Sequence, residues 1–272
     1  MEGQMTDLNF ETAKQILNSP ANYFGPTLDE FLEQNPKAQP WEVSDDKKLQ
    51  MMKNQGKYNF FGPDEWDKFF HGIVDLSNIP LIPWSKDDLM NPVIKSPHFL
   101  FLGIDNMNYE STTIPLLLKL FQGPNHPKFY YSLAKSLNTE INKRKCETKW
   151  YLMHVDGYGK PGLSYEDLAF SLPIQYEPCH AIERVLGNIL FYLLNDVYLD
   201  STLTLVNDVL DPNSDMAFIS SFRTDGLFID SGRTGGFGGI AAARRVESEI
   251  AERQEQLRHI NDSLTDMKNL WA

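Results

Sequence analysis

Hydrophobic positions recur at helical spacing in several stretches of the chain, and the clearest stretch lies in its second half. Apolar residues follow one another at intervals of three and four from Ile182 to Leu194, and Pro178 stands just ahead of them. This pattern predicts one long amphipathic helix. A second apolar run, from Thr112 to Phe121, also predicts a helix.

Shorter apolar runs in the same half of the chain predict strands. The segment 98–104 is mostly apolar and is typical of a buried strand, and Trp150–Met153 gives a second signal of this kind. Asp-Pro and Asp-Gly turn signals separate three further short strands, expected at 203–206, 217–222 and 227–229. A long helix packed on a sheet of short strands predicts an α+β domain over residues 96–245.

The segments that flank this domain have a different pattern. Residues 1–95 show short helical patterns separated by Pro and Gly, and they predict a helical N-terminal module. Residues 246–272 place apolar residues alternately three and four apart, interrupted once by Arg253, and they predict a coiled-coil helix. The pattern favours self-association, although a helix that folds back on its own domain would show the same pattern.

Charge and composition narrow the classes of function. The chain of 272 residues has 25 Lys+Arg and 37 Asp+Glu, a formal net charge of -12, so its surface repels phosphate backbones and nucleic-acid binding is not expected. Its 2 cysteines are too few for a disulfide framework or a zinc site. No apolar run reaches the roughly 20 residues of a membrane span. The first residues lack the basic start and apolar core of a signal peptide, so a cytoplasmic or virion-associated protein is expected.

Residues that carry catalytic chemistry are sparse. The 6 histidines show no metal-ligand spacing with one another, and we expect neither a metal nor a cofactor. Cys179, His180 and Glu183 offer a thiol, a base and an acid, but neighbouring residues of a helix point in different directions, so a nucleophile–base pair is not expected. Cys146 follows a basic run, Lys143–Lys145, that can lower the pKa of its thiol, although most such cysteines have no catalytic role.

Two other patterns fall short of known site templates. Asp208, Asp211 and Asp215 miss both the spacing and the glycine of an EF-hand calcium loop, and a turn between strands is the simpler interpretation. The segment Gly236–Ala241 formally matches a dinucleotide-binding fingerprint, yet no strand directly precedes it and a polar heptad helix follows. We interpret the Gly-rich stretch as a surface loop.

Several segments resemble one protein family, in the family's order. Residues 222–229 (FRTDGLFI), then a loop, then residues 239–245 (GIAAARR) are similar to the C-terminal ends of variable proteins of diversity-generating retroelements. Those ends typically read F-x-x-x-G-L-x-V, a short polar loop and G-L-A-A-S-R-K. Upstream, WYLM at 150–153 and YEPCHAIERV at 176–185 resemble two more segments of the family, so the resemblance covers roughly residues 95 to 245.

The resemblance implies a C-type-lectin-like fold, akin to that of formylglycine-generating enzymes, and a binding protein whose ligand surface is rewritten at adenines by a reverse transcriptase. Rewritten AAT and AAC codons cannot encode Lys, Glu, Gln, Met or Trp. These types make up 57 of the 272 residues, so a window of 21 residues should hold about four of them, whereas residues 218–238 hold none. The composition of this window supports the resemblance.

A rigid scaffold tolerates changing side chains only where they face solvent. We expect Ile219, Leu227, Ile229 and Ile240 to be fixed core partners. The resemblance then assigns ligand binding to the other positions of the alternating strands and to the loop, namely Phe218, Ser221, Arg223, Thr224, Asp230, Ser231, Arg233, Thr234, Gly235, Gly236, Phe237 and Gly238.

The expected ligand is a protein or a surface glycan. Each Gly-rich site would bind weakly, and a homo-oligomer formed through residues 246–272 would bind more tightly through avidity. An alternative is a structural or assembly subunit of a phage or cellular particle, with the same fold but no diversification. An enzyme is the least favoured hypothesis, because the related formylglycine-generating enzymes need paired cysteines and Cys146 and Cys179 lie in different predicted elements.

Overall fold

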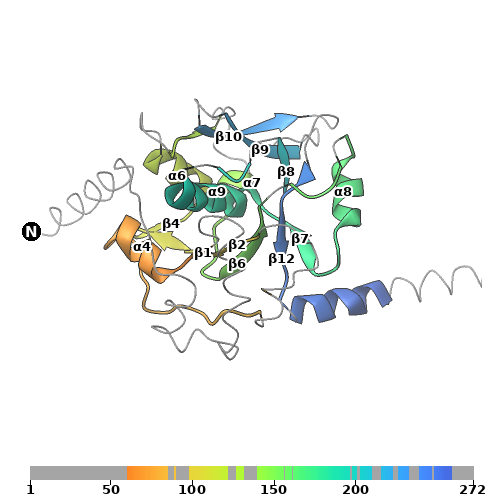
Figure 1. The fold of residues 1–272 in the computed structure, drawn as a ribbon, viewed down its shortest axis with the longest axis horizontal. Coiled ribbons are helices and arrows are strands. Elements are labelled where there is room, and N and C mark those ends of the chain that lie inside the picture. Colours follow the sequence, from red (N-terminus) through yellow and green to blue (C-terminus); the bar gives the residue numbers. More distant parts are fainter. Residues whose placement is uncertain are drawn as a thin grey trace, which may run out of the picture.

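The computed structural model describes two five-stranded sheets, a two-stranded sheet and several helices in an α+β arrangement, so the expected mixed class is confirmed (Figure 1). The described residues are 60–84, 89, 98–121, 127–131, 140–155, 157–160, 162–196, 198–200, 203–209, 216–222, 226–232, 239–246 and 248–258.

A five-stranded sheet, called here the lower sheet, has the strand order β1-β2-β6-β12-β7. Its strands are β1 (Phe60–Phe61), β2 (His98–Leu102), β6 (Trp150–His154), β12 (Ala242–Arg244) and β7 (Tyr176–Pro178). β1 runs parallel to β2, and the other neighbours are antiparallel. Every residue of β2 and β6 is buried, which confirms the two buried strands predicted from their apolar runs.

A second five-stranded sheet, called here the upper sheet, has the strand order β11-β8-β9-β10-β5. Its strands are β11 (Gly239–Ile240), β8 (Thr204–Val209), β9 (Met216–Phe222), β10 (Gly226–Gly232) and β5 (Phe129–Tyr131). β8, β9 and β10 are antiparallel neighbours and correspond to the three short strands predicted after the long helix. A separate small hairpin joins β3 (Asn106–Met107) to β4 (Glu110–Ser111).

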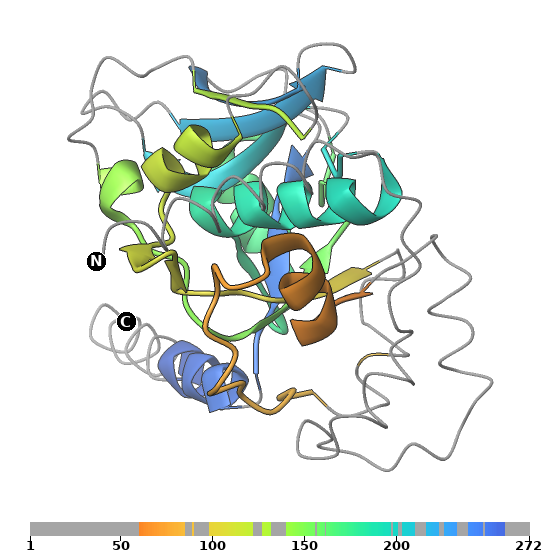
Figure 2. The same ribbon diagram turned by 90° about the vertical axis from the view of Figure 1, so that its left-hand side faces the viewer.

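The long predicted helix is α9 (Ala181–Asn195), and it lies between the two sheets (Figures 1 and 2). The helix is buried over most of its length because both of its sides face apolar strands. Gly187 permits the close approach to the lower sheet, since a Cβ there would lie 3.1 Å from the sulfur of Met153 and 3.2 Å from the ring of Phe101. Four shorter helices also lie among the described residues, α4 (Pro63–Phe70), α6 (Ile114–Leu120), α7 (Glu140–Lys143) and α8 (Tyr165–Ser171).

A buried ion pair fixes α9 to its neighbours. Arg184 is 0% exposed and donates from Nε and Nη2 to the two carboxylate oxygens of Asp200, at 2.9 and 2.6 Å. Its remaining donors reach the carbonyl oxygens of His154 and Val155, at 2.6 and 2.7 Å. Asn188 completes the network by donating to Asp200 at 2.6 Å. The helix, the end of β6 and the segment before β8 are therefore held in one arrangement.

The described part of the segment 1–95 packs into the same core as the residues that follow it. β1 pairs with β2, and Trp66 is fully buried and donates from its indole nitrogen to the carbonyl oxygen of Leu102 at 2.8 Å. Residues 60–84 are thus not a separate module. The part of the predicted N-terminal module at residues 1–59 stays a prediction, because those residues lie outside the described part of the chain.

Glu65 is an acid inside this corner of the core. It is 1% exposed, and its Oε2 accepts a hydrogen bond of 2.7 Å from the backbone nitrogen of Gly62, at the start of α4. Burial raises the pKa of Glu65 from 4.5 to about 7, and the hydrogen bond from Gly62 opposes that rise.

A helix at residues 248–258 follows β12 and extends away from the sheets (Figure 1). Ile250 is buried against the body, whereas residues 251–258 are all exposed. The rest of the predicted coiled coil, 259–272, lies outside the described residues. Among the described residues, no helix has the length and apolar character needed to cross a membrane.

Candidate functional site

The hairpin β9–β10 carries the described part of the predicted ligand surface. Ile219 stands opposite Ile229 in its antiparallel register, and Leu227 stands opposite Ser221. Ile219, Leu227 and Ile229 are 0% exposed and belong to the main core beside α9, and Ile240 in β11 is also 0% exposed. The burial expected of these four residues is confirmed.

The expectation that Phe218 faces the ligand is wrong. The strand alternation predicts that its ring faces solvent, but the residue is only 8% exposed and packs in a second small core with Leu168, Leu205 and Ile240. The physical reason is α8, which sequence analysis does not predict and which brings Leu168 onto this part of the upper sheet. Asp230, the cross-strand partner of Phe218, is partly exposed.

Of the other predicted ligand-binding residues, two lie in the strands of this hairpin and the rest lie outside the described residues. Ser221 lies in β9 opposite Leu227, and Ser231 lies in β10 opposite Ala217. The structure therefore brings together Phe218 and Asp230 and places the two serines along the same hairpin. The residues that lie outside the described part of the chain are Arg223, Thr224, Arg233, Thr234, Gly235, Gly236, Phe237 and Gly238.

The two undescribed stretches connect to opposite ends of β10. Residues 223–225 join the end of β9 to Gly226, and residues 233–238 join Gly232 to β11. A strand of this length spans roughly 20 Å at about 3.3 Å per residue.

Gly239 fixes the far end of the second stretch. A Cβ at this position would lie 2.7 Å from the carbonyl carbon of Gly157 and 2.8 Å from the carbonyl oxygen of Tyr158. Ile240 and Tyr158 exchange backbone hydrogen bonds of 2.8 Å in both directions. The close backbone approach gives a physical reason for glycine at the start of the GIAAARR segment.

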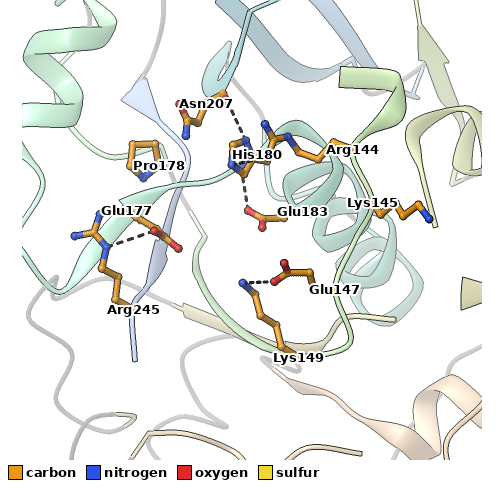
Figure 3. Close-up of a pocket in the computed structure, with 10 residues that line it drawn as sticks. All are labelled: Arg144, Lys145, Glu147, Lys149, Glu177, Pro178, His180, Glu183, Asn207 and Arg245. Atoms are coloured by element: carbon orange, nitrogen blue, oxygen red, sulfur yellow. Dashed lines mark hydrogen bonds and ion pairs between the residues drawn. The ribbon is translucent and has the colours of Figure 1, made fainter. Parts of the chain in front are cut away.

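A second feature, which we call the charged cleft, lies where β7, β12 and the beginning of α9 meet (Figure 3). It is a cavity of about 260 Å³, and its lining consists of charged and polar side chains together with one proline. The lining residues are Arg144, Lys145, Glu147, Lys149, Glu177, Pro178, His180, Glu183, Asn207 and Arg245.

His180 and Glu183 are positioned in the cleft by the start of α9. His180 precedes the helix, and its backbone nitrogen donates to Glu183 Oε2 at 2.9 Å, an arrangement typical of a helix start. The Nδ1 of His180 lies 2.9 Å from the carbonyl oxygen of Asn207 and must donate to it, while Nε2 lies 3.2 Å from Nη1 of Arg144 and accepts. The imidazole is therefore committed to structural contacts.

Burial, hydrogen bonds and neighbouring charges shift the pKa values of three groups in the cleft. Burial raises the pKa of Glu183, and the hydrogen bond from His180 only partly offsets this rise. For Lys149 burial lowers the pKa, but the hydrogen bond and the charge of Glu147 outweigh it and the net shift is upward. For His180 burial also lowers the pKa, and the contacts with Asp208 turn the net direction upward.

The cysteines are unsuited to nucleophilic chemistry. Cys179 is 0% exposed and Cys146 is 1% exposed. Burial raises the pKa of both thiols, that of Cys146 to about 12, so the lowering expected from the neighbouring basic run is wrong. The reason is that the Cys146 thiol lies inside the core beside the hydroxyl of Tyr151.

Asp208 connects the start of α9 to Arg144. Its carboxylate accepts a hydrogen bond of 2.6 Å from the backbone nitrogen of Ala181 and lies 3.2 Å from Nε of Arg144. Asp211 and Asp215 lie outside the described residues. Within the described part of the chain, no group of His, Cys, Asp and Glu side chains is arranged to hold a metal ion.

Sequence analysis did not find the charged cleft, although two local signals of it are present. One is the alternation of charges from Arg144 to Lys149, and the other is the Glu three residues after His180, which is typical of a helix start. Neither signal shows that these segments meet β7 and β12 at one cavity. No family model, curated protein or solved structure matches the chain.

Proposed function

We propose that this chain is a non-enzymatic ligand-binding protein with a C-type-lectin-like fold. Its recognition surface lies along the hairpin β9–β10 and on the stretches 223–225 and 233–238 that connect to both ends of β10. Retroelement diversification acts on this surface. The ligand is a protein or a surface glycan.

The observation that carries the proposal is the anchoring of the hairpin. Ile219, Leu227 and Ile229 are 0% exposed and attach the hairpin to the core beside α9. Changes at Asp230, which is partly exposed, or in the connecting stretches leave these anchors in place. A surface of this kind can vary in sequence while its scaffold stays constant.

The lower sheet gives a second line of support. The segments WYLM and GIAAARR, which resemble the retroelement family, contribute β6 and β12, and YEPCHAIERV contributes β7 and the start of α9. β12 lies between β6 and β7, so these segments are neighbours in one sheet although they are far apart in sequence. Such mutual packing is a physical reason for the segments to occur together.

The C-terminal helix supports the oligomeric part of the proposal. Residues 251–258 are exposed, and Leu257 in the predicted seam is 39% exposed. A second copy of this helix is the natural partner for a heptad seam, because a seam of this kind is self-complementary. Several weak sites on one oligomer would then bind a multivalent ligand through avidity.

The test is to sequence the gene and its flanks across a natural population. The proposal predicts that substitutions gather at adenine-derived codons between residues 220 and 238, with a template repeat nearby, and that codons 218, 219, 227 and 229 stay constant. A window as constant as the rest of the gene would refute diversification. The remaining hypothesis would then be an assembly subunit built on the same fold.

A further inference from the structure

The turn of the hairpin β3–β4 holds a tyrosine where glycine is favoured. Met107 pairs with Glu110 in the antiparallel register, so the turn between the strands has two residues, Asn108 and Tyr109. Both have a positive φ, 51° and 63°, which is the conformation of a type I′ turn. Such turns favour asparagine at the first position and glycine at the second. A bulky side chain at the second position strains the backbone.

No contact within the described part of the chain offsets this strain. Tyr109 is 94% exposed, and among the described residues its hydroxyl forms no hydrogen bond and its ring stacks on no other ring. The two other non-glycine residues with a positive φ in that part of the chain have local partners. Asn108 donates from its backbone nitrogen to the carbonyl oxygen of Ile73 at 2.6 Å, and Asp196 ends α9 and donates to the carbonyl oxygen of Tyr192 at 2.8 Å. Backbone strain is concentrated at functional positions, so Tyr109 is a candidate for one.

The base of the hairpin is attached to the body at several points. Met107 is 0% exposed and pairs with Val74 in an isolated antiparallel bridge. The backbone nitrogen of Thr112 donates to the carbonyl oxygen of Asp105 at 2.8 Å, and the Asp105 carboxylate accepts a hydrogen bond of 2.8 Å from the hydroxyl of Thr148. An aromatic side chain presented on such a base loses little conformational freedom when a partner buries it.

We propose that Tyr109 anchors a protein–protein contact, with its ring entering an apolar recess of a partner protein. Tyrosine is one of the residue types that dominate the binding energy of interfaces when they fill a pocket on the partner. A single ring at the tip of a two-residue turn projects from the surface and suits a recess. Tyr109 lies outside the window 218–238, and this contact stands or falls independently of the proposed function.

The charges around the tip favour a protein partner. The carboxylate of Glu110, next to Tyr109, lies 3.1 Å from the Nζ of Lys119, so this cation is already paired and does not offer a free charge to a phosphate or an anionic lipid. The net charge of -12 repels nucleic acids and anionic membranes, and it attracts a protein with a basic surface. The expected partner therefore has an apolar recess with a basic rim.

Urea unfolding of Tyr109→Gly and Tyr109→Ala tests the strain. Glycine adopts a positive φ freely, and we expect Tyr109→Gly to raise the folding equilibrium constant about fivefold, even though glycine also loosens the unfolded chain. Tyr109→Ala keeps the Cβ and should stay within about twofold of the unaltered chain, because the ring has no internal contact to lose. Equal constants for the unaltered chain and Tyr109→Gly would mean that the turn is unstrained, and they would overturn the proposal.

Position-specific cross-linking tests the contact. The full chain is made in the organism that carries the gene, with p-benzoylphenylalanine in place of Tyr109, and is then irradiated. Phe170 on α8 is also 94% exposed, and the same replacement there is the matched control. We expect a discrete adduct with another protein from position 109 and none from position 170. Excess unaltered chain and excess Tyr109→Phe should suppress the adduct, whereas Tyr109→Gly should need at least a tenfold higher concentration.

The competition makes the cross-link specific to the ring. Because Tyr109→Gly is expected to fold more stably than the unaltered chain, its failure to compete would not result from unfolding. Equal competition by Tyr109→Gly and the unaltered chain would overturn the proposal, and so would the absence of an adduct at position 109. An adduct between two copies of this chain would contradict a separate partner protein. Saturable binding to vesicles of phosphatidylcholine and phosphatidylglycerol that Tyr109→Gly abolishes would also overturn the proposal, because the tip would then be a membrane contact.

Discussion

Glu65 offers a quantitative test of how this core is built. The side chain is 1% exposed, and burial raises its pKa from 4.5 to about 7. Between these pH values the folded chain keeps a proton that the unfolded chain releases. The free energy of unfolding therefore falls as pH rises through this window, and the full loss is present above pH 7.

The size of the change in the free energy of unfolding follows from the pKa shift of Glu65. At about 1.4 kcal/mol for each pKa unit, a rise from 4.5 to about 7 corresponds to roughly 3 kcal/mol. Glu65→Gln keeps an oxygen that accepts the hydrogen bond from Gly62 and removes the titration. We expect the two chains to be similarly stable near pH 4.5, and the Glu65→Gln variant to be more stable by about 3 kcal/mol near pH 8.

Urea unfolding followed by tryptophan fluorescence at a series of pH values measures this difference. Other groups titrate in the same range, but they are common to both chains and cancel in the comparison. Glu166→Gln, at an exposed position of α8, controls for the substitution itself. A stability difference between the unaltered chain and the Glu65→Gln variant that stays constant from pH 4.5 to pH 8 would refute the reasoning.

Three further predictions rest on buried groups and on the exposed helix. Asp200→Asn removes the negative charge that pairs with the buried Arg184, so we expect the free energy of unfolding in urea to fall by about 3–5 kcal/mol. A fall of less than about 1 kcal/mol would contradict this prediction. Cys146 and Cys179 should not react with a thiol reagent at pH 8 until urea is added, because both thiols are buried and have raised pKa values. Labelling of the folded chain would contradict this prediction. Leu257→Asp should lower the mass found by light scattering and leave the circular dichroism unchanged, whereas an unchanged mass would argue against the seam.

The sequence predicts the elements whose side chains follow a clear local period. Ile182 to Leu194 repeat at three and four, and α9 forms there. The apolar run at 98–104 becomes β2, which is buried throughout. In both cases the spacing of the apolar residues follows from the geometry of a helix or a buried strand. It can therefore be recognised without knowing which elements pack against that segment.

Other features depend on partners that no local pattern reveals. The three residues of β12, Ala-Ala-Arg, show no alternation, yet they pair with β6 on one side and β7 on the other. Phe218 is buried because α8 lies next to it, and no local pattern shows that these two segments meet. The charged cleft likewise arises only when segments from residues 144 to 245 meet.

The attachment point of the C-terminal helix has a mechanical consequence. The helix continues from β12, which is an inner strand of the lower sheet and hydrogen-bonds to neighbours on both sides. A pull on the helix is therefore shared between two rows of backbone hydrogen bonds, one to β6 and one to β7. An edge strand would have only one such row. The indole of Trp84 adds a further restraint, since it donates to the carbonyl oxygen of Arg245 at 2.9 Å, just where the strand ends. A helix attached in this way passes a pull to the sheet without separating one edge strand from it.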